Sequence, residues 1–392
     1  MKHLNKTFFI SPILLCHLYG GDSGILSQTK QDIIHYSYQQ VIEDTNKLKK
    51  DWINPINYKY IYNKGENYTT KRSFIGINQP IFKSGGIYFA IKYANSVSDY
   101  SKTSVDIQQK ELIKQTINLL FQIKKTQLLI KKQKLLVANG KLDIARKKEQ
   151  VLNGLLDTSF LDNAILNTNK HKNTLIDLEY QQETLINKLT QFTDKKHTEL
   201  ELPTLKLIEN SSFMENNIYI KQAKEEINNS YWLKNMTISN YLPTVNFTAD
   251  YTKYHDRGNN TRLDESTSNI GFNITIPIDT RFLNTIESNK LKYLKNKATL
   301  EDKKKKEEVL FNNTIAKVKI LDKKISITHD DVELYDSLLT QLQEQLDAGI
   351  ATESDVQTMQ NSKEIKKLEL RSLEIDKQIE LLEIYARTYN RK

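Results

Sequence analysis

The most restrictive feature of this sequence is an internal repeat, because two landmarks recur at nearly the same offset. Pro80 is matched by Pro277, 197 residues later, and Gly154 is matched by Gly349, 195 residues later. Within each half, the proline and the glycine are 74 and 72 residues apart. This agreement predicts a duplicated chain in which each half is one copy of the same structural unit.

Between the proline and the glycine, each half consists of one long helical stretch. The predicted helices cover 87–152 and 283–346, and Gly140 is an interior weak point of the first. A helix of about 65 residues is about 100 Å long. Apolar residues recur every seven positions, which is the period of coiled-coil packing. The rows are Phe121, Leu128, Leu135 and Leu142, then Phe311, Val318, Ile325, Val332, Leu339 and Leu346, and in the last helix Leu368, Ile375, Leu382 and Tyr389.

A two-strand segment precedes each long helix. The predicted strands are 56–63, 73–79, 245–252 and 269–276. Apolar and polar residues alternate along them, so each strand has one apolar side. Each has about the 9–11 residues that cross a bilayer at a tilt. Two soluble hairpins packed on a core would show the same alternation, but the flanking helices are too long to fold back over the apolar sides.

Four strands are too few to close a barrel, whereas three copies of the chain supply twelve. The sequence therefore predicts a homotrimer of a mainly α, internally duplicated chain. Each chain contributes to a long α-helical coiled-coil barrel and adds four transmembrane β-strands. The predicted parts are a signal peptide at 1–21, a first repeat at 22–192 with a β-hairpin at 55–80 and a tip near 154, an equatorial segment at 193–217, and a second repeat at 218–392 with a β-hairpin at 243–277 and a tip near 349.

The N-terminus has the pattern of a secretory signal peptide. Two lysines precede an apolar run from Thr7 to Leu18, and small residues follow. Cys16, the single cysteine, excludes an internal disulfide and a cysteine-based metal cluster. It is also a candidate site of lipid attachment, although Leu15 before it fits that pattern poorly. No other stretch approaches the roughly 20 apolar residues of a membrane-spanning helix, so any crossing would use strands.

The basic excess does not indicate a nucleic-acid partner. Lys and Arg number 57 against 48 Asp and Glu, but the lysines are spread along helices and mixed with glutamate and asparagine. Nucleic-acid binding concentrates positive charge on one patch. The histidines lie in unrelated segments, with no H-x-x-x-H pattern, phosphate loop or nucleophile elbow. We therefore expect no enzyme, no catalytic residue, no metal site and no cofactor.

Two segments carry a family resemblance. The stretch 79–88, Gln-Pro-Ile-Phe-Lys-Ser-Gly-Gly-Ile-Tyr, is similar to the strand-to-helix junction of the TolC family of outer-membrane efflux and secretion channels. The stretch 346–356, Leu-Asp-Ala-Gly-Ile-Ala-Thr-Glu-Ser-Asp-Val, resembles that family's second periplasmic tip. The resemblance implies a homotrimeric duct in the outer membrane and periplasm, surrounded by lipid at its barrel, for efflux or type I secretion. It also implies tips that dock onto a periplasmic adaptor coupled to an inner-membrane pump.

The resemblance further implies where the functional residues lie. Asp355 matches an aspartate of the family's periplasmic constriction, Thr358 stands where a second would be, and Ser159 and Phe160 fill the matching positions of the first half. Three Asp355 carboxylates on one axis would repel one another and attract cations. Alternatively, Asp355 is only a first-turn carboxylate favoured by the helix dipole. The expected docking residues are Gly154, Leu155, Gly349 and Ile350, and the expected barrel-to-tunnel junction residues are Pro55, Pro80, Gly85, Gly86, Pro243 and Pro277.

Two other classes of protein also contain long helical hairpins. A periplasmic adaptor carries one such hairpin inserted in other domains, whereas this sequence predicts two in tandem. A structural coiled-coil protein without a pore is the other alternative, and the apolar strands argue against it. The sequence does not identify a cargo, because drugs, metal ions and proteins leave through similar ducts.

Overall fold

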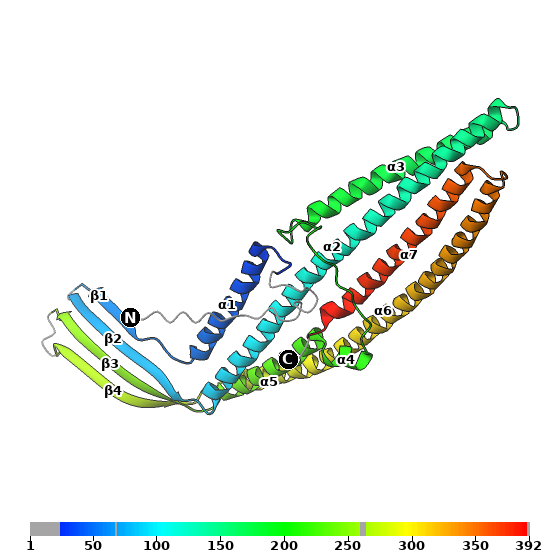
Figure 1. The fold of residues 1–392 in the computed structure, drawn as a ribbon. Coiled ribbons are helices and arrows are strands. Elements are labelled where there is room, and N and C mark those ends of the chain that lie inside the picture. Colours follow the sequence, from blue (N-terminus) through cyan, green and yellow to red (C-terminus); the bar gives the residue numbers. More distant parts are fainter. Residues whose placement is uncertain (1–23, 67–68, 259–263, 390–392) are drawn as a thin grey trace, which may run out of the picture. The chain divides into compact units, whose positions relative to one another are not determined.

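The computed structural model describes residues 24–66, 69–258 and 264–389 (Figure 1). The predicted signal peptide and Cys16 lie outside the described residues. The elements are α1 (Gln28–Lys50), β1 (Asn57–Lys64), β2 (Thr69–Phe82), α2 (Gly86–Leu152), α3 (Thr158–Leu189), α4 (Asn210–Glu215), α5 (Ile218–Ser239), β3 (Thr244–Asp256), β4 (Ser266–Thr275), α6 (Phe282–Asp347) and α7 (Glu353–Arg387). This mainly α architecture with four strands confirms the predicted fold class.

The two long helices begin and end within one residue of the predicted ranges. Each ends at a glycine turn, and a second helix follows it. α2 continues through Gly140 without a break, as the predicted uninterrupted helix requires. A β-carbon added there would lie 2.5 Å from the Thr168 hydroxyl oxygen of α3. The glycine therefore permits a close approach of two helices.

The chain divides into two compact units, which we describe separately. One comprises the residues through Ile34, Ile107–Asn217 and Lys306–Lys392, and the other comprises His35–Asp106 and Ile218–Lys305. The first contains both helical tips. The second contains the sheet and the helix segments that adjoin it.

The sheet is antiparallel with strand order β1-β2-β3-β4, so the two predicted hairpins join through β2 and β3. β2 begins at Thr69, four residues before the predicted start, because its pairing with β1 extends to Lys64. The β2–β3 register shifts between Pro80 and Phe82. Proline lacks the amide hydrogen of a ladder bond, and such a bulge accommodates it.

One side of the sheet is apolar and exposed. On β1 it presents Tyr58, Tyr60 and Tyr62, which are 53–67% exposed, and on β4 Ile270 and Phe272 are 78% and 69% exposed. Residues of the opposite side include asparagine, threonine and aspartate, and the Asn269 amide donates to Asp250. Apolar and polar side chains therefore lie on opposite sides of the sheet, as the alternation predicted, and the apolar side is exposed.

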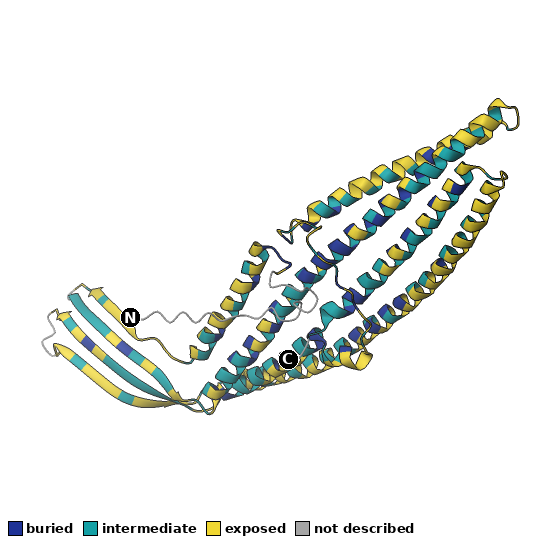
Figure 2. Ribbon diagram, viewed as in Figure 1, coloured by how far each residue is buried: buried dark blue, intermediate teal, exposed yellow. Residues whose placement is uncertain are grey.

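In the unit with the tips, α3, α2, α7 and α6 lie side by side in that order (Figure 1). The four helices share one apolar core with the segment between α3 and α4. Its buried members are Ile113, Ile117, Leu120, Phe121 and Ile123 of α2, Leu185 and Leu189 of α3, Leu205, Val318 of α6, Leu381 and Leu382 of α7, with Ile25 and Leu26. In Figure 2 the turns at both tips are exposed. Among the described helices, none is both long and apolar enough to cross a membrane.

Candidate functional site

Both helical tips are built from the same turn. At the first, the amide of Leu155 donates to the Gln150 carbonyl (2.8 Å) and the amide of Gly154 donates to Val151 (3.0 Å). At the second, Ile350 donates to Gln345 (2.8 Å) and Gly349 to Leu346 (2.9 Å). These two bonds define the Schellman motif, whose glycine is left-handed. Gly154 and Gly349 have φ values of +69° and +74°, which confirms the predicted turn role.

The residue after each glycine is apolar and exposed. Leu155 is 76% and Ile350 is 79% exposed, and Leu152 and Phe160 are exposed as well. No heavy atom lies within 4 Å of a β-carbon built at either glycine. Each tip therefore presents apolar side chains on a turn whose backbone is fixed by its own hydrogen bonds.

The second tip is closed by a capping box. Thr352 accepts the amide of Asp355 on its hydroxyl (3.2 Å), and the Asp355 carboxylate accepts the amide and the hydroxyl of Thr352 (3.2 and 2.7 Å). The carboxylate also contacts Arg146 of α2, with Nη1 and Oδ1 3.1 Å apart. The hydrogen bonds from Thr352 lower the pKa of Asp355; burial opposes this, and Arg146 adds to the lowering. Asp355 is thus an ionised member of the capping box, with Thr352 as the N-cap, as well as a gate candidate.

The other gate candidates lie in separate local settings. Thr358 donates its hydroxyl to the Ser354 carbonyl (2.8 Å), within α7. Ser159 donates its amide to the Asp157 carboxylate (2.8 Å), the N-cap of α3. Phe160 donates its amide to the Asp157 carbonyl (3.2 Å). Within one chain, none of the described contacts joins Ser159 or Phe160 of α3 to Asp355 or Thr358 of α7.

Sequence analysis missed a ladder of polar pairs between α2 and α7. Its members are seven residues apart on both helices. They pair Lys125 with Asp376 (2.6 Å), Lys132 with Glu369 (2.6 Å), Asn139 with Ser362 (3.5 Å) and Arg146 with Asp355 (3.1 Å). Asn361 also donates to the Asn139 side chain (2.7 Å). The matched sevenfold spacing of cations and acids was the available signal, since antiparallel helices in contact align such rows.

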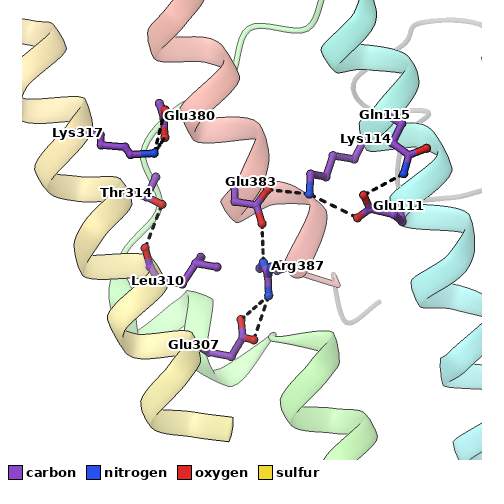
Figure 3. Close-up of polar contacts among 10 residues, drawn as sticks. All are labelled: Glu111, Lys114, Gln115, Glu307, Leu310, Thr314, Lys317, Glu380, Glu383 and Arg387. Atoms are coloured by element: carbon purple, nitrogen blue, oxygen red, sulfur yellow. Dashed lines mark hydrogen bonds and ion pairs between the residues drawn. The ribbon is translucent and has the colours of Figure 1, made fainter. Parts of the chain in front are cut away.

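A connected ion-pair network lies at the end of the α2–α7 interface that is farther from the tips (Figure 3). It consists of Lys114, Glu307, Glu383 and Arg387, and it is called here the clamp. Arg387 Nη1 lies 3.0 Å from Glu307 Oε1, and its Nε lies 2.8 Å from Glu383 Oε1. Lys114 Nζ lies 2.7 Å from Glu383 Oε2. The clamp therefore joins α2, α6 and α7.

Within the clamp, the Glu307 side chain is far less exposed than the side chains of the ion pairs near the tips. The Glu307 side chain is 3% exposed, and it also accepts a bond from the Asn217 amide (2.9 Å). Burial acts to raise the pKa of Glu383, but bonds from Lys114 and Arg387 outweigh it and lower that pKa. Burial likewise acts to lower the pKa of Lys114, and its bonds to Glu383 and Glu111 raise it. Both groups are therefore charged at neutral pH.

The strand-to-helix junction depends on two left-handed residues. Gly85 has φ +82°, as its glycine allows, while Ser84 has φ +44°, which the sequence did not predict. The Ser84 hydroxyl donates to the Pro243 carbonyl (2.7 Å). A β-carbon on Gly86 would lie 2.6 Å from the Ser239 hydroxyl oxygen. The junctions before α2 and before β3 are thereby held together.

The predicted junction prolines lie at strand ends. Pro80 pairs with Asn246 of β3, and Pro277 follows the end of β4. The linker that contains Pro55 is bonded to β2, because Gln79 accepts the Asn54 amide (2.8 Å) and donates to the Trp52 carbonyl (3.1 Å). In the part of the chain that the structure describes, no group of three or more His, Cys, Asp or Glu residues could hold a metal ion.

Comparison with known proteins gives matches by structure. No protein-family model and no curated protein sequence matches the chain. The outer membrane protein VceC of Vibrio cholerae is 14% identical over 92% of this chain and 94% of its own, with a TM-score of 0.70. The CmeC outer membrane channel of Campylobacter jejuni is 12% identical over 93% and 83%, with a TM-score of 0.73. The open-state MtrE outer membrane channel of Neisseria gonorrhoeae is 11% identical over 92% and 86%, with a TM-score of 0.69.

The chain has the fold of these outer-membrane channels. At such low identity the likeness establishes the fold, and it confirms the resemblance found in the sequence. Within this channel fold, the structure brings Gly85, Gly86 and Pro243 together at the junction, and it places Asp355 against Arg146 of α2. The gate and docking roles of the predicted residues remain predictions.

Proposed function

We propose that this chain is one subunit of a trimeric outer-membrane channel, a passive duct that spans the outer membrane and continues through the periplasm. The observation that carries the proposal is the channel fold, which this chain shares over 92–93% of its length with CmeC, VceC and MtrE. A passage requires no catalytic group. The energy for export would come from a partner.

The sheet supports a trimer. β1 and β4 are the edges of a four-stranded sheet, so among the described residues each has one side without a neighbouring strand. Open edges with apolar side chains are prone to pair with other strands. Three copies joined β1 to β4 would form a closed twelve-stranded barrel with its apolar side toward lipid.

The outer helices of the tip unit support the same assembly. Ile320, Ile327 and Leu334 of α6 are seven residues apart and 55–63% exposed. On α3, Ile176 and Tyr180 are 63% and 76% exposed. A sevenfold apolar row on an outer helix is suited to coiled-coil packing, and a head-to-tail contact between α6 of one copy and α3 of the next closes into a ring.

Conductance of the purified protein in a planar bilayer, with its mass by native mass spectrometry, tests this proposal. We expect a trimer that conducts. A monomer without conductance would refute the duct and favour a structural coiled-coil protein.

We further propose that the tips dock onto a periplasmic adaptor coupled to an inner-membrane pump. The support is the pair of exposed apolar residues, Leu155 and Ile350, on turns of identical design. Replacing both with aspartate is expected to abolish copurification with the adaptor while the trimer persists. Tyr36→Ser, at an exposed tyrosine of α1, is the matched control. Adaptor binding that survives the tip substitutions would contradict the docking role.

Asp355 is proposed as the acidic gate residue, with Thr358, Ser159 and Phe160 as further candidates. Asp355→Asn removes the charge but keeps a hydrogen-bonding side chain at the cap. We expect its single-channel conductance to rise and its cation preference to fall, because three like charges would no longer face one axis. Unchanged selectivity would leave Asp355 as a helix cap alone.

A further inference from the structure

The apolar side of the sheet changes character along the strands. Residues that pair directly across neighbouring strands share one side of a sheet, so the strand register assigns each residue to a side. In the half of the sheet next to the helices, Ile77, Ala249 and Ile270 lie side by side on the apolar side. The register places no charged residue of the described strands on this side of that half.

Positive charges begin on the same side in the half of the sheet next to the β1–β2 and β3–β4 turns. Lys253 of β3 lies opposite Ser73 of β2, and Lys71 of β2 lies opposite Tyr62 of β1. Lys71 Nζ is 5.9 Å from the centroid of the Tyr62 ring. Both lysines belong to the two central strands of the sheet, so each chain carries the pair whatever lies beside its edge strands.

A chain of polar side chains accompanies the two lysines. Ser73 Oγ lies 2.8 Å from His255 Nε2 and 3.1 Å from the hydroxyl oxygen of Tyr58. The His255 ring lies beside that of Tyr60, with 6.0 Å between the ring centroids. His255 is therefore on the same side of the sheet as the tyrosines of β1. The hydroxyl and imidazole groups add hydrogen-bonding capacity next to the positive charges.

Neither lysine has an acidic partner among the described residues. Asp256 is the acid opposite Lys71, but its carboxylate accepts the Gly258 amide (3.0 Å) at the start of the turn. Lys253 is exposed. Two ammonium groups next to hydroxyl and imidazole groups suit an anion that carries several hydrogen-bond acceptors, and phosphate is such an anion.

The lysines lie at the height that lipid head groups occupy around a barrel. Lys71 precedes Phe82, the last residue of β2, by eleven residues. At about 3.3 Å per residue and a strand tilt of about 35–45°, these residues span about 26–30 Å of membrane depth. The apolar band of a transmembrane barrel is about 25 Å tall. If Phe82 marks one boundary of this band, Lys71 lies at the other.

We propose that Lys71 and Lys253, together with Ser73 and His255, form a binding site for the phosphate group of a lipid in the outer leaflet of the membrane. This site rests on the proposed function, which puts the sheet in the outer membrane with its turns outside. A lipid fits better than a free anion, because the lysines continue the apolar side of the sheet. Acyl chains that cover Ile77 would bring their own phosphate to the lysines.

The opposite side of the sheet supplies a matched control. Lys59 of β1 lies opposite Phe74, which in turn lies opposite Thr252. This row is one residue along the strands from the row of Lys253, so Lys59 has almost the same height but the other side of the sheet. Lys59 is exposed, as Lys253 is. The two lysines therefore differ mainly in the side on which they lie.

Equilibrium binding of a lipid to the purified full-length protein in detergent tests the site. The probe is a fluorescent, diphosphorylated glucosamine disaccharide lipid, and its dephosphorylated form is the comparison. Combined Lys71→Gln and Lys253→Gln should raise the dissociation constant of the phosphorylated lipid by about ten- to thirtyfold, since each basic residue near an anionic surface contributes roughly fivefold. Lys59→Gln should change it less than about twofold.

Two further measurements identify what the lysines recognise. Combined Lys71→Arg and Lys253→Arg, which keeps both charges, should bind the phosphorylated lipid as the unsubstituted protein does. The dephosphorylated lipid should bind all variants alike. Equal effects of Lys59→Gln and the double glutamine variant, or no effect of either, would overturn the site. Inorganic phosphate that binds as tightly as the lipid would overturn the assignment to a lipid.

Native mass spectrometry and conductance of the same samples separate this site from the duct. If the double glutamine variant is not trimeric, Lys253→Gln alone replaces it, with an expected increase of about fivefold in the dissociation constant. A conducting trimer whose lipid affinity ignores both lysines would keep the duct and reject the site. Phosphate-dependent lipid binding through these lysines without conductance would keep the site and reject the duct.

Discussion

Gly140 of α2 faces Thr168 of α3 so closely that an added β-carbon would lie 2.5 Å from the threonine hydroxyl oxygen and 3.1 Å from its methyl group. Thr168 is 1% exposed, and its hydroxyl donates to the Ala164 carbonyl (2.8 Å). Rotation of the threonine cannot relieve the contact, because both of its branches are close. The first hairpin therefore depends on a glycine at this position.

Gly140→Ala should accordingly destabilise the hairpin, although alanine favours a helix by about 1 kcal/mol over glycine. We expect a net loss of about 1–3 kcal/mol from overpacking, measured by urea unfolding. Thr168→Ala combined with Gly140→Ala should recover most of the loss, because the oxygen and the methyl group are gone. A double variant no more stable than Gly140→Ala would contradict this account.

Removal of the Glu307 carboxylate should be far more costly than removal of a half-buried acid, Glu380, that joins the same two helices. Glu307→Ala leaves Arg387 without its least exposed partner, and we expect a loss of about 3 kcal/mol in the free energy of unfolding. Glu380→Ala, which breaks the contact with the exposed Lys317 of α6 (3.2 Å), should cost about 1 kcal/mol or less. Equal losses in the two variants would mean that burial does not set the strength of the clamp.

Asp355 should contribute to the stability of the second tip over almost the whole pH range. Its pKa is lowered in the folded chain, so its contribution is full above the unfolded value near pH 4 and is lost only as the pH falls through the lower folded value. Asp355→Ala should weaken the start of α7 by about 1 kcal/mol at pH 7, as loss of a cap does. Arg146→Ala should weaken it less, because that pair is exposed.

Amide hydrogen exchange of 353–358 at pH 5 to 8 measures this contribution. A clear change in the difference between the Asp355→Ala and unsubstituted proteins within that range would contradict the predicted pH window.

Glu225 of α5 should destabilise the chain when it is ionised. Burial raises its pKa, Thr103 and Lys221 lower it, and Asp99 and Asp106 raise it again, with a net rise. Its Oε2 atom is buried without a hydrogen-bond partner. The folded state thus holds the proton more tightly, and stability declines as the pH rises from the unfolded value near 4.3 through the folded value.

Glu225→Gln removes this ionisation. We expect the variant to be more stable than the unsubstituted protein by about 1 kcal/mol at pH 7 and equally stable at pH 4, measured by the midpoint of thermal unfolding. Lys221→Ala is the matched control, and it should act in the opposite direction at pH 7 because it removes a cation 3.9 Å from Glu225. A Glu225→Gln variant that is less stable than the unsubstituted protein at pH 7 would show that the ionised carboxylate is needed.

Periodicity in the sequence was sufficient for the elements and their sides. The stretch between the proline and the glycine of each half predicted α2 and α6 to within one residue, and the sevenfold apolar rows predicted that these helices pack as coiled coils. Gly154 and Gly349 predicted the tip turns, because a left-handed residue is least costly as glycine. The alternation of Tyr58, Tyr60 and Tyr62 likewise predicted the apolar side of β1.

Only the tertiary structure decided which elements meet. The sequence did not reveal that β2 pairs with β3, that Gly140 accommodates Thr168, or that Arg146 reaches Asp355 209 residues away. Glu307 appeared as one acid within a lysine-rich run, and its burial between α6 and α7 made it part of the clamp. The physical reason is that periodicity records which side of a helix or strand is apolar, whereas the strength of a polar contact depends on how completely other parts of the chain exclude water from it.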